Sequence, residues 1–180
     1  MPSPLADRPG QYKPWAIFLL LICLTSGLFF APVVEMGLAE HDAETLRDNA
    51  LISNDLGYFL SPHKAQITGR PVAELAKWLA SLLCGDDPHL LHVAGISLHT
   101  LSAILLAALL RKMAADLLLC FSASFLFLTN IGHFYAVYHF SGIDYPLALF
   151  LVLLGMTCYV QMVAAGGKIW TVGAYFCFGC

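Results

Sequence analysis

The residues best suited to chemistry are two acids that stand beside apolar runs, Asp48 and Asp144. Asp48 lies in a polar segment, where its carboxylate could act as the general base for an acceptor hydroxyl. It is also one of nine acids between residues 35 and 87, so a solvated surface role is the alternative. Asp144 is the only acid between residues 135 and 145 and directly precedes an apolar run, where it could cap a helix.

One arginine has a position that could serve anion binding. Arg70-Pro71 predicts the start of a helix, because proline suits a first helical turn, where its missing N–H costs nothing. The guanidinium of Arg70 could hold a lipid phosphate in a bidentate fork. Alternatively, the side chain only extends toward the lipid headgroups.

Histidines form a third group of candidates. His92 and His99 are seven positions apart, which places both on one face of a helix. Ionisable residues inside a membrane span commonly point into the bundle and often carry function. The two histidines could pack as neutral hydrogen-bonded residues or ligate haem or a chlorophyll magnesium, and His133 and His139 offer the same choices. No partner pattern accompanies them, so we expect structural roles and predict no cofactor.

The six cysteines give no metal site. Most of them lie inside apolar runs, where cysteine behaves as a small hydrophobic residue. Cys177 and Cys180 form a C-x-x-C pair, but no second pair completes the set of about four ligands that a metal needs. We therefore predict no metal.

The elements that position these residues follow from composition. The 180 residues are 59% hydrophobic and only 12% charged, with a mean hydropathy of +0.74. Soluble domains average about 25% charged residues, so this chain has too few polar groups to cover a water-exposed surface. A net charge of −3 also offers no basic surface for nucleic acid. We therefore predict an integral membrane protein that contacts the lipid bilayer.

Apolar runs predict a helical bundle that crosses the membrane. A helix of about 20 apolar residues crosses the roughly 30 Å hydrocarbon layer. We expect four full spans, at residues 15–34, 90–110, 114–134 and 146–163. The fold class is thus all-α, a polytopic membrane helical bundle that forms a single membrane domain over residues 1–180.

A partial fifth helix is predicted at residues 169–180. Its 12 residues would be about 18 Å long as a helix, which is too short to cross the bilayer. A half-inserted helix needs a protein neighbour for its terminal backbone groups. We expect it to pack against other membrane subunits, through Ile169, Trp170, Tyr175, Phe176 and Phe178.

The polar segment at residues 35–87 predicts a folded loop outside the bilayer, with nine acids against four bases. Inside it, apolar residues recur at helical spacing from Pro71 to Cys84, with Glu74 and Lys77 on the other side. This pattern predicts an amphipathic helix, and its tryptophan suits the headgroup level. We expect this helix to lie along the membrane surface.

Basic residues predict the orientation. Short connections rich in Lys and Arg stay in the cytoplasm. We therefore expect a cytoplasmic N-terminus, in a bacterial inner membrane or in the endoplasmic reticulum, with the acidic loop on the opposite side. The basic residues that favour this orientation are Arg8, Lys13, Arg111, Lys112 and Lys168.

Six short stretches follow one another along the chain: Asp48-Asn49 with Ile52 and Asn54, Arg70-Pro71-Val72, Gly85-Asp86-Asp87-Pro88, His92 to His99, Arg111-Lys112, and Tyr135-Ala136-Val137 with Ser141-Gly142. Their order and spacing resemble the N-terminal membrane region of GT-C-fold glycosyltransferases, which use lipid-phosphate sugar donors. The likeness is greatest to tetratricopeptide-containing O-mannosyltransferase-like proteins. It covers about residues 15 to 178.

The resemblance implies roles for the candidate residues. In such an enzyme Asp48 and Asp144 would be the catalytic carboxylates, with Asp48 as a general base or in assistance to a metal. Asp144 and Arg70 would line the donor site. His92 and His99 would join Arg70 in binding a polyprenyl-phosphate sugar. Four positions depart from the family's pattern, and each loses a charge or a polar group: Asn49, Gly95, Tyr135 and Ile143.

These losses decide our expectation of function. Catalysis on a lipid phosphate needs several preorganised donors around the leaving group. We therefore expect a non-catalytic accessory or scaffold subunit of a larger membrane protein complex, derived from a GT-C glycosyltransferase N-terminus. One alternative is a glycosyltransferase, as a fragment or as half of a split enzyme, that uses a polyprenyl-phosphate sugar. A second alternative is a subunit that binds haem or chlorophyll at His92 and His99.

Overall fold

The computed structural model describes residues 12–55, 57, 70–113 and 115–179, so Arg8 and Cys180 lie outside it. All regular structure within these ranges is helical, which confirms the all-α class. The helices are α1 (Tyr12–Val34), α2 (Glu40–Asn54), α3 (Pro71–Cys84), α4 (Pro88–Lys112), α5 (Leu117–Leu128), η2 (Ile131–His133), α6 (Phe134–Tyr138), η3 (Phe140–Gly142), α7 (Asp144–Ala165) and α8 (Lys168–Gly179).

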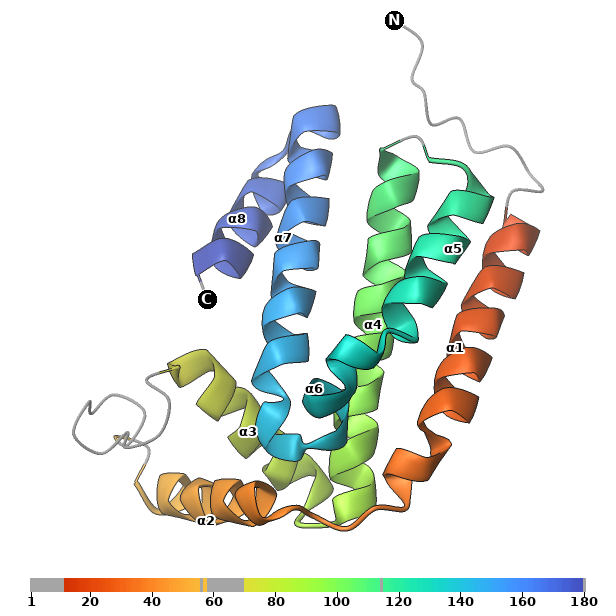
Figure 1. Cartoon of the computed structure of the whole chain (residues 1–180). Coiled ribbons are helices and arrows are strands. Elements are labelled where there is room, and N and C mark those ends of the chain that lie inside the picture. The colour runs from red at the N-terminus through yellow and green to blue at the C-terminus, as the bar shows by residue number, and fades with distance from the viewer. Residues whose placement is uncertain (1–11, 56, 58–69, 114, 180) are drawn as a thin grey trace, which may run out of the picture.

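Three of the helical segments are long and apolar enough to cross a membrane, which indicates an integral membrane protein. They are α1, α4 and the segment Phe140–Ala165 that contains α7. These segments cover the spans that we predicted at residues 15–34, 90–110 and 146–163. Figure 1 shows α4 in the middle of the bundle, with α1 on one side of it and α7 on the other.

Small residues on α4 explain its central place. Ser102, Ala103 and Ala107 are fully buried, and short side chains let neighbouring helices approach closely. The hydroxyl groups of Ser26 on α1 and Thr100 on α4 lie 2.6 Å apart and share a hydrogen bond. The leucines on the outer side of α1 are exposed, as expected for a surface that faces lipid chains.

The expected third span at residues 114–134 is not one continuous helix, so the described chain has three candidate spans rather than four. Helix α5 ends at Leu128 after 12 residues, and the chain continues through η2 and α6. The side-chain oxygen of Asn130 accepts a hydrogen bond from the backbone N–H of Gly132 at 2.9 Å. A local side-chain turn of this kind competes with helix continuation. The mean hydropathy of residues 114–134 does not reveal this turn.

Helices α2 and α3 lie across one end of the bundle (Figure 1). Helix α3 has the bounds that the sequence predicted, Pro71–Cys84, with proline in its first turn. It ends at Gly85, whose φ of 63° suits glycine. Asp87 then caps α4 by accepting a hydrogen bond from the backbone N–H of His89 at 2.9 Å. Helix α2 was not predicted within the polar segment.

The polar face of α3 points into the protein. Glu74 and Lys77 are 7% and 3% exposed, whereas Leu82 and Leu83 are 64% and 83% exposed. Lys77 Nζ donates to Glu74 Oε1 at 3.4 Å, and Asn49 of α2 donates to the backbone oxygen of Lys77 at 3.3 Å. The charged face thus contacts α2, and Leu82 and Leu83 are exposed on the other side of the helix.

Helix α8 folds back on α7 after the turn Gly166-Gly167, where φ is +69° and +110°. The two helices touch at glycines. A Cβ added at Gly155 would lie 3.1 Å from Cys177 Cβ, and one added at Gly173 would lie 3.1 Å from Cys158 Sγ. The partial helix that we predicted at residues 169–180 is therefore present as α8, packed tightly on α7 through small residues.

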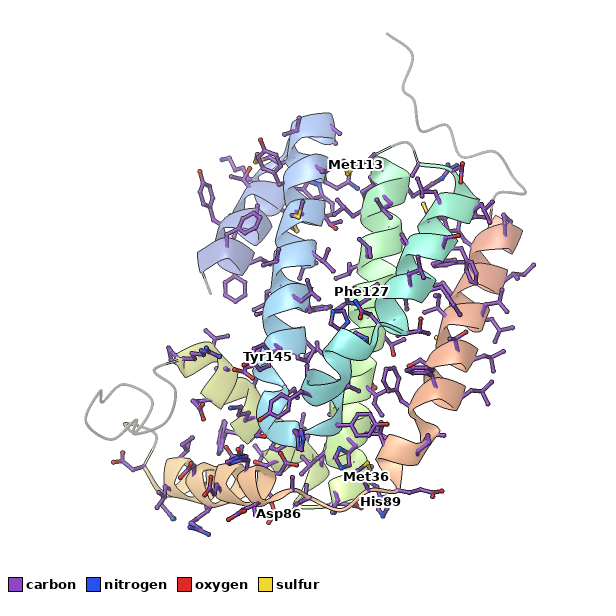
Figure 2. All side chains as sticks on the ribbon, in the orientation of Figure 1. Met36, Asp86, His89, Met113, Phe127 and Tyr145 are labelled. Atoms are coloured by element: carbon purple, nitrogen blue, oxygen red, sulfur yellow. The ribbon has the colours of Figure 1, made fainter. Side chains whose placement is uncertain are left out.

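The two ends of the bundle differ in charge. Figure 2 shows Met36, Asp86 and His89 at the end that carries α2 and α3, and Met113 at the opposite end. Helices α4 and α7 both finish at the Met113 end, which places the basic pair Arg111-Lys112 and the Lys168 turn on one side.

Candidate functional site

An ion pair joins the start of α3 to the start of α7. Arg70 stands directly before α3, and Asp144 is the first residue of α7. Arg70 Nη1 donates to Asp144 Oδ2 at 2.5 Å. The Arg70 side chain is 57% exposed and that of Asp144 only 9%, so the pair reaches from the surface into the protein.

Asp144 does not cap α7 with its side chain. Ile143 is the N-cap residue of the helix and no side-chain cap hydrogen bond is formed. A negative charge in a first helical turn is still favoured by the helix dipole. Asp144 Oδ1 is buried and has no hydrogen-bond partner among the described residues, so one of the two carboxylate oxygens is unsatisfied there.

A cavity of about 610 Å³ opens beside the ion pair. Arg70, Asp144 and Tyr145 line one end of it, and Figure 2 shows Tyr145 at the lower end of α7, near α3. The rest of the wall is mainly apolar and comes from α3, α7 and α8. Its members on α7 and α8 are Leu147, Ala148, Leu151, Val152, Cys177 and Phe178.

Asp48 lies elsewhere, on α2, and does not line this cavity. Its partial burial and the nearby Glu74 carboxylate raise the pKa of Asp48, against the opposing effect of Arg47. The structure therefore brings Arg70 and Asp144 together at one cavity and leaves Asp48 outside it. The raised pKa of Asp48, without a cavity that the residue lines, does not identify a substrate-binding site there.

Asp42 is a structural residue that the sequence did not reveal. It is fully buried, and its Oδ1 accepts a hydrogen bond from the backbone N–H of Ser141 at 2.7 Å. Its Oδ2 accepts another from the backbone N–H of Ala39 at 3.1 Å. Asp42 thus fixes the start of α2 to the segment that leads into Asp144. The sequence position of Asp42 could have suggested the start of a helix, because acids are common in a first helical turn. It could not have revealed the hydrogen bond to Ser141, which is 99 residues away.

The histidines lie between helices, away from the cavity. His99 is 2% exposed, its Nε2 is 3.3 Å from the backbone oxygen of Leu128, and its ring is 4.9 Å from that of Phe127 (Figure 2). His133 packs edge-on against His99 at 5.2 Å. His92 is 1% exposed and neither ring nitrogen has a partner. His139 packs on the ring of Tyr135 at 4.6 Å.

No metal-binding group of three or more His, Cys, Asp or Glu side chains occurs among the residues that the structure describes. His99 already has a packed, hydrogen-bonded setting between α4 and α5, so a haem or chlorophyll there would have to displace neighbouring aromatic rings.

The outward face of α8 is apolar and open. The aromatic and aliphatic side chains that we expected to contact a partner are exposed, by 37% to 78%. They are Ile169, Trp170, Tyr175 and Phe176, together with Phe178, whose ring also lines the cavity and lies against Gly155 of α7.

The chain matches no protein-family model, no curated protein and no solved structure. The resemblance to GT-C glycosyltransferases therefore remains a prediction from the sequence.

Proposed function

We propose that the chain is a non-catalytic accessory or scaffold subunit of a larger membrane complex, derived from a GT-C glycosyltransferase N-terminus. The observation that carries this proposal is the arrangement of the two candidate catalytic acids. Asp144 forms an ion pair with Arg70, and both residues line the cavity. Asp48 lies on α2, outside this cavity. Transfer from a lipid phosphate needs the base and the phosphate ligands around one reacting centre.

The outward face of α8 is the surface by which we expect the chain to join its partner. Helices in lipid associate by close packing and hydrogen bonding rather than by hydrophobic burial. A partner helix must therefore have a shape that is complementary to the side chains on this face of α8. Tyr175 and Phe176 project from this face and are 78% and 68% exposed. Large rigid aromatic side chains of this kind commonly anchor protein interfaces.

The same proposal includes a membrane arrangement. Helices α5 and α6 together would form a fourth, broken crossing beside α4, since broken helices are tolerated in membranes where they pack against protein. The end that carries Arg111, Lys112 and Lys168 would face the cytoplasm, which places α2 and α3 on the outer surface.

A pair of matched double variants tests the proposal in native membranes. Tyr175→Ser with Phe176→Ser changes the α8 face, and Leu20→Ser with Leu24→Ser changes the outward face of α1, where the leucines are 59% and 52% exposed. On native gels of mild detergent extracts, we expect only the α8 variant to leave the large complex. Asp48→Asn should leave the complex assembled. Equal behaviour of the two double variants would contradict the proposal.

A glycosyltransferase that uses a polyprenyl-phosphate sugar remains the second candidate. One observation favours it: Arg70 and Asp144, which the resemblance implies at the donor site, line one cavity. If this candidate is correct, Asp48→Asn should lower sugar transfer by about 10²–10⁴-fold, because general-base catalysis contributes that much. Retained assembly together with this loss would favour the enzyme.

A further inference from the structure

The cavity beside α8 has a polar end and an apolar end, which is the outline of an amphiphile. Asp144 begins α7, and Gly155 is the α7 residue that meets Cys177 of α8. The rise between these two α7 positions is about 16 Å. This is about one leaflet of a roughly 30 Å hydrocarbon layer. The cavity volume of about 610 Å³ also falls within the usual range of ligand sites, about 300–1,000 Å³.

The polar end can hold an anion. Arg70 donates only from Nη1 to Asp144, and its other guanidinium N–H groups have no partner among the residues that the structure describes. Val72 and Ala73 also line the cavity, at the N-terminus of the 14-residue helix α3. The free backbone N–H groups of a first helical turn favour a phosphate. A guanidinium and a helix start at one place form a suitable phosphate ligand set.

The same end also requires a hydrogen-bond donor. Asp144 Oδ1 is buried without a partner, and a buried acceptor without a donor is costly. Asp144 lines the cavity, and its carboxylate can accept more hydrogen bonds than the one from Arg70. A ligand with an ammonium group would supply the missing donor.

Charge then selects the class of lipid. Arg70 and Asp144 together carry no net charge. A ligand with a net charge would leave one charge uncompensated at a partly buried site, which is unfavourable. A zwitterion matches both partners, with its phosphate on Arg70 and its cation on Asp144. A primary ammonium can donate hydrogen bonds to the Asp144 carboxylate, whereas a quaternary ammonium has no N–H.

We propose that this cavity binds a zwitterionic membrane phospholipid with a primary ammonium headgroup, of the ethanolamine type. The phosphate lies on Arg70 and the start of α3, and the ammonium lies on Asp144. One acyl chain follows α7 along Leu147, Leu151 and Val152 toward α8. This site does not depend on the proposed scaffold role, so either can fail without the other.

Native mass spectrometry of the purified chain tests the site. The detergent-solubilised protein is mixed with equimolar dioleoyl phosphatidylethanolamine, phosphatidylcholine and phosphatidylglycerol, and the lipid retained per chain is counted. We expect the ethanolamine lipid to be retained about tenfold more than the choline lipid, because a hydrogen bond to a charged group is worth about that factor. Asp144→Asn should reduce this preference to about twofold or less.

Other variants separate the two ends of the site. Arg70→Gln should lower retention of all three lipids, since it removes the phosphate ligand. Val152 is 44% exposed on the cavity wall and lies eight residues beyond Asp144 on α7, so Val152→Trp should fill the apolar part away from the ion pair. Asp48→Asn and Arg47→Gln are the matched controls on α2 and should leave the amount and kind of retained lipid unchanged.

Three results would overturn the site. They are equal retention of the ethanolamine and choline lipids by the native chain, greatest retention of the anionic lipid, and an unchanged preference in Asp144→Asn. If Asp144→Asn fails to fold, Val152→Trp still decides, because unaltered lipid retention by that variant also rejects the cavity as the site.

Discussion

Replacing Gly173 by cysteine should join α8 to α7 through a disulfide bond with Cys158. A Cβ at Gly173 would lie 3.8 Å from Cys158 Cβ. Bonded cysteines have Cβ atoms about 3.5–4.5 Å apart, with a mean near 3.8 Å. The bond closes a loop of about 15 residues, for which the chain-entropy model gives about 3 kcal/mol of stabilisation. This figure is an upper bound in a membrane, because helices remain formed in the unfolded state there.

The assay is oxidation in native membranes, in a background where the other cysteines are alanine. The cross-linked chain is lighter by two hydrogens in intact mass spectrometry and does not react with maleimide. Gly179→Cys on the same helix is the control, because a Cβ there meets nothing within 4 Å. Adding Gly155→Leu should lower the yield of the cross-link, since a side chain there collides with Phe178 and with the Cβ at position 177, which alanine retains. Overpacking of this kind costs about 1–3 kcal/mol. No cross-link from Gly173→Cys, or equal cross-linking from Gly179→Cys, would refute the α7–α8 packing.

Three further predictions concern the surface helices and the orientation. In sealed membrane vesicles, cysteine at Asp86 should react with a membrane-impermeant maleimide on the non-cytoplasmic side and cysteine at Lys112 only on the cytoplasmic side. The reverse pattern would reject the cytoplasmic N-terminus. Lys77→Met removes the buried ammonium that faces the Glu74 carboxylate, so unfolding should become easier by about 3 kcal/mol, with partial recovery in the double variant with Glu74→Gln. Because the pKa of Asp48 is raised on folding, its ionisation destabilises the folded state as pH rises through that pKa. Asp48→Asn should therefore be more stable than the native chain at pH 7 and lose this advantage on acidification, as measured by thermal unfolding at several pH values.

Elements with strong local signals could be predicted from the sequence. Three long apolar runs became α1, α4 and α7, because only a helix satisfies its own backbone in lipid. Helix α3 was also predicted with its bounds, since Arg70-Pro71 and Gly85 mark a helix start and end on their own.

The failures have physical causes in tertiary contacts and local turns. The third span was predicted as continuous because hydropathy averages over Asn130 and Gly132, whose local hydrogen bond ends the helix. Helix α2 was missed because few apolar residues mark it, and Asp42 and Asn49 hold it through bonds to distant segments. The pairing of Arg70 with Asp144, 74 residues apart, also depends on the fold rather than on spacing.

Photo-cross-linking from α8 in native membranes tests the accessory-subunit proposal most directly. A benzophenone amino acid replaces Tyr175 on the outward face of α8, and Leu20 on the outward face of α1 as the control. If α8 joins the chain to a partner subunit, irradiation gives one discrete protein adduct from Tyr175 and lipid adducts alone from Leu20. Lipid adducts alone from both positions would contradict the proposal.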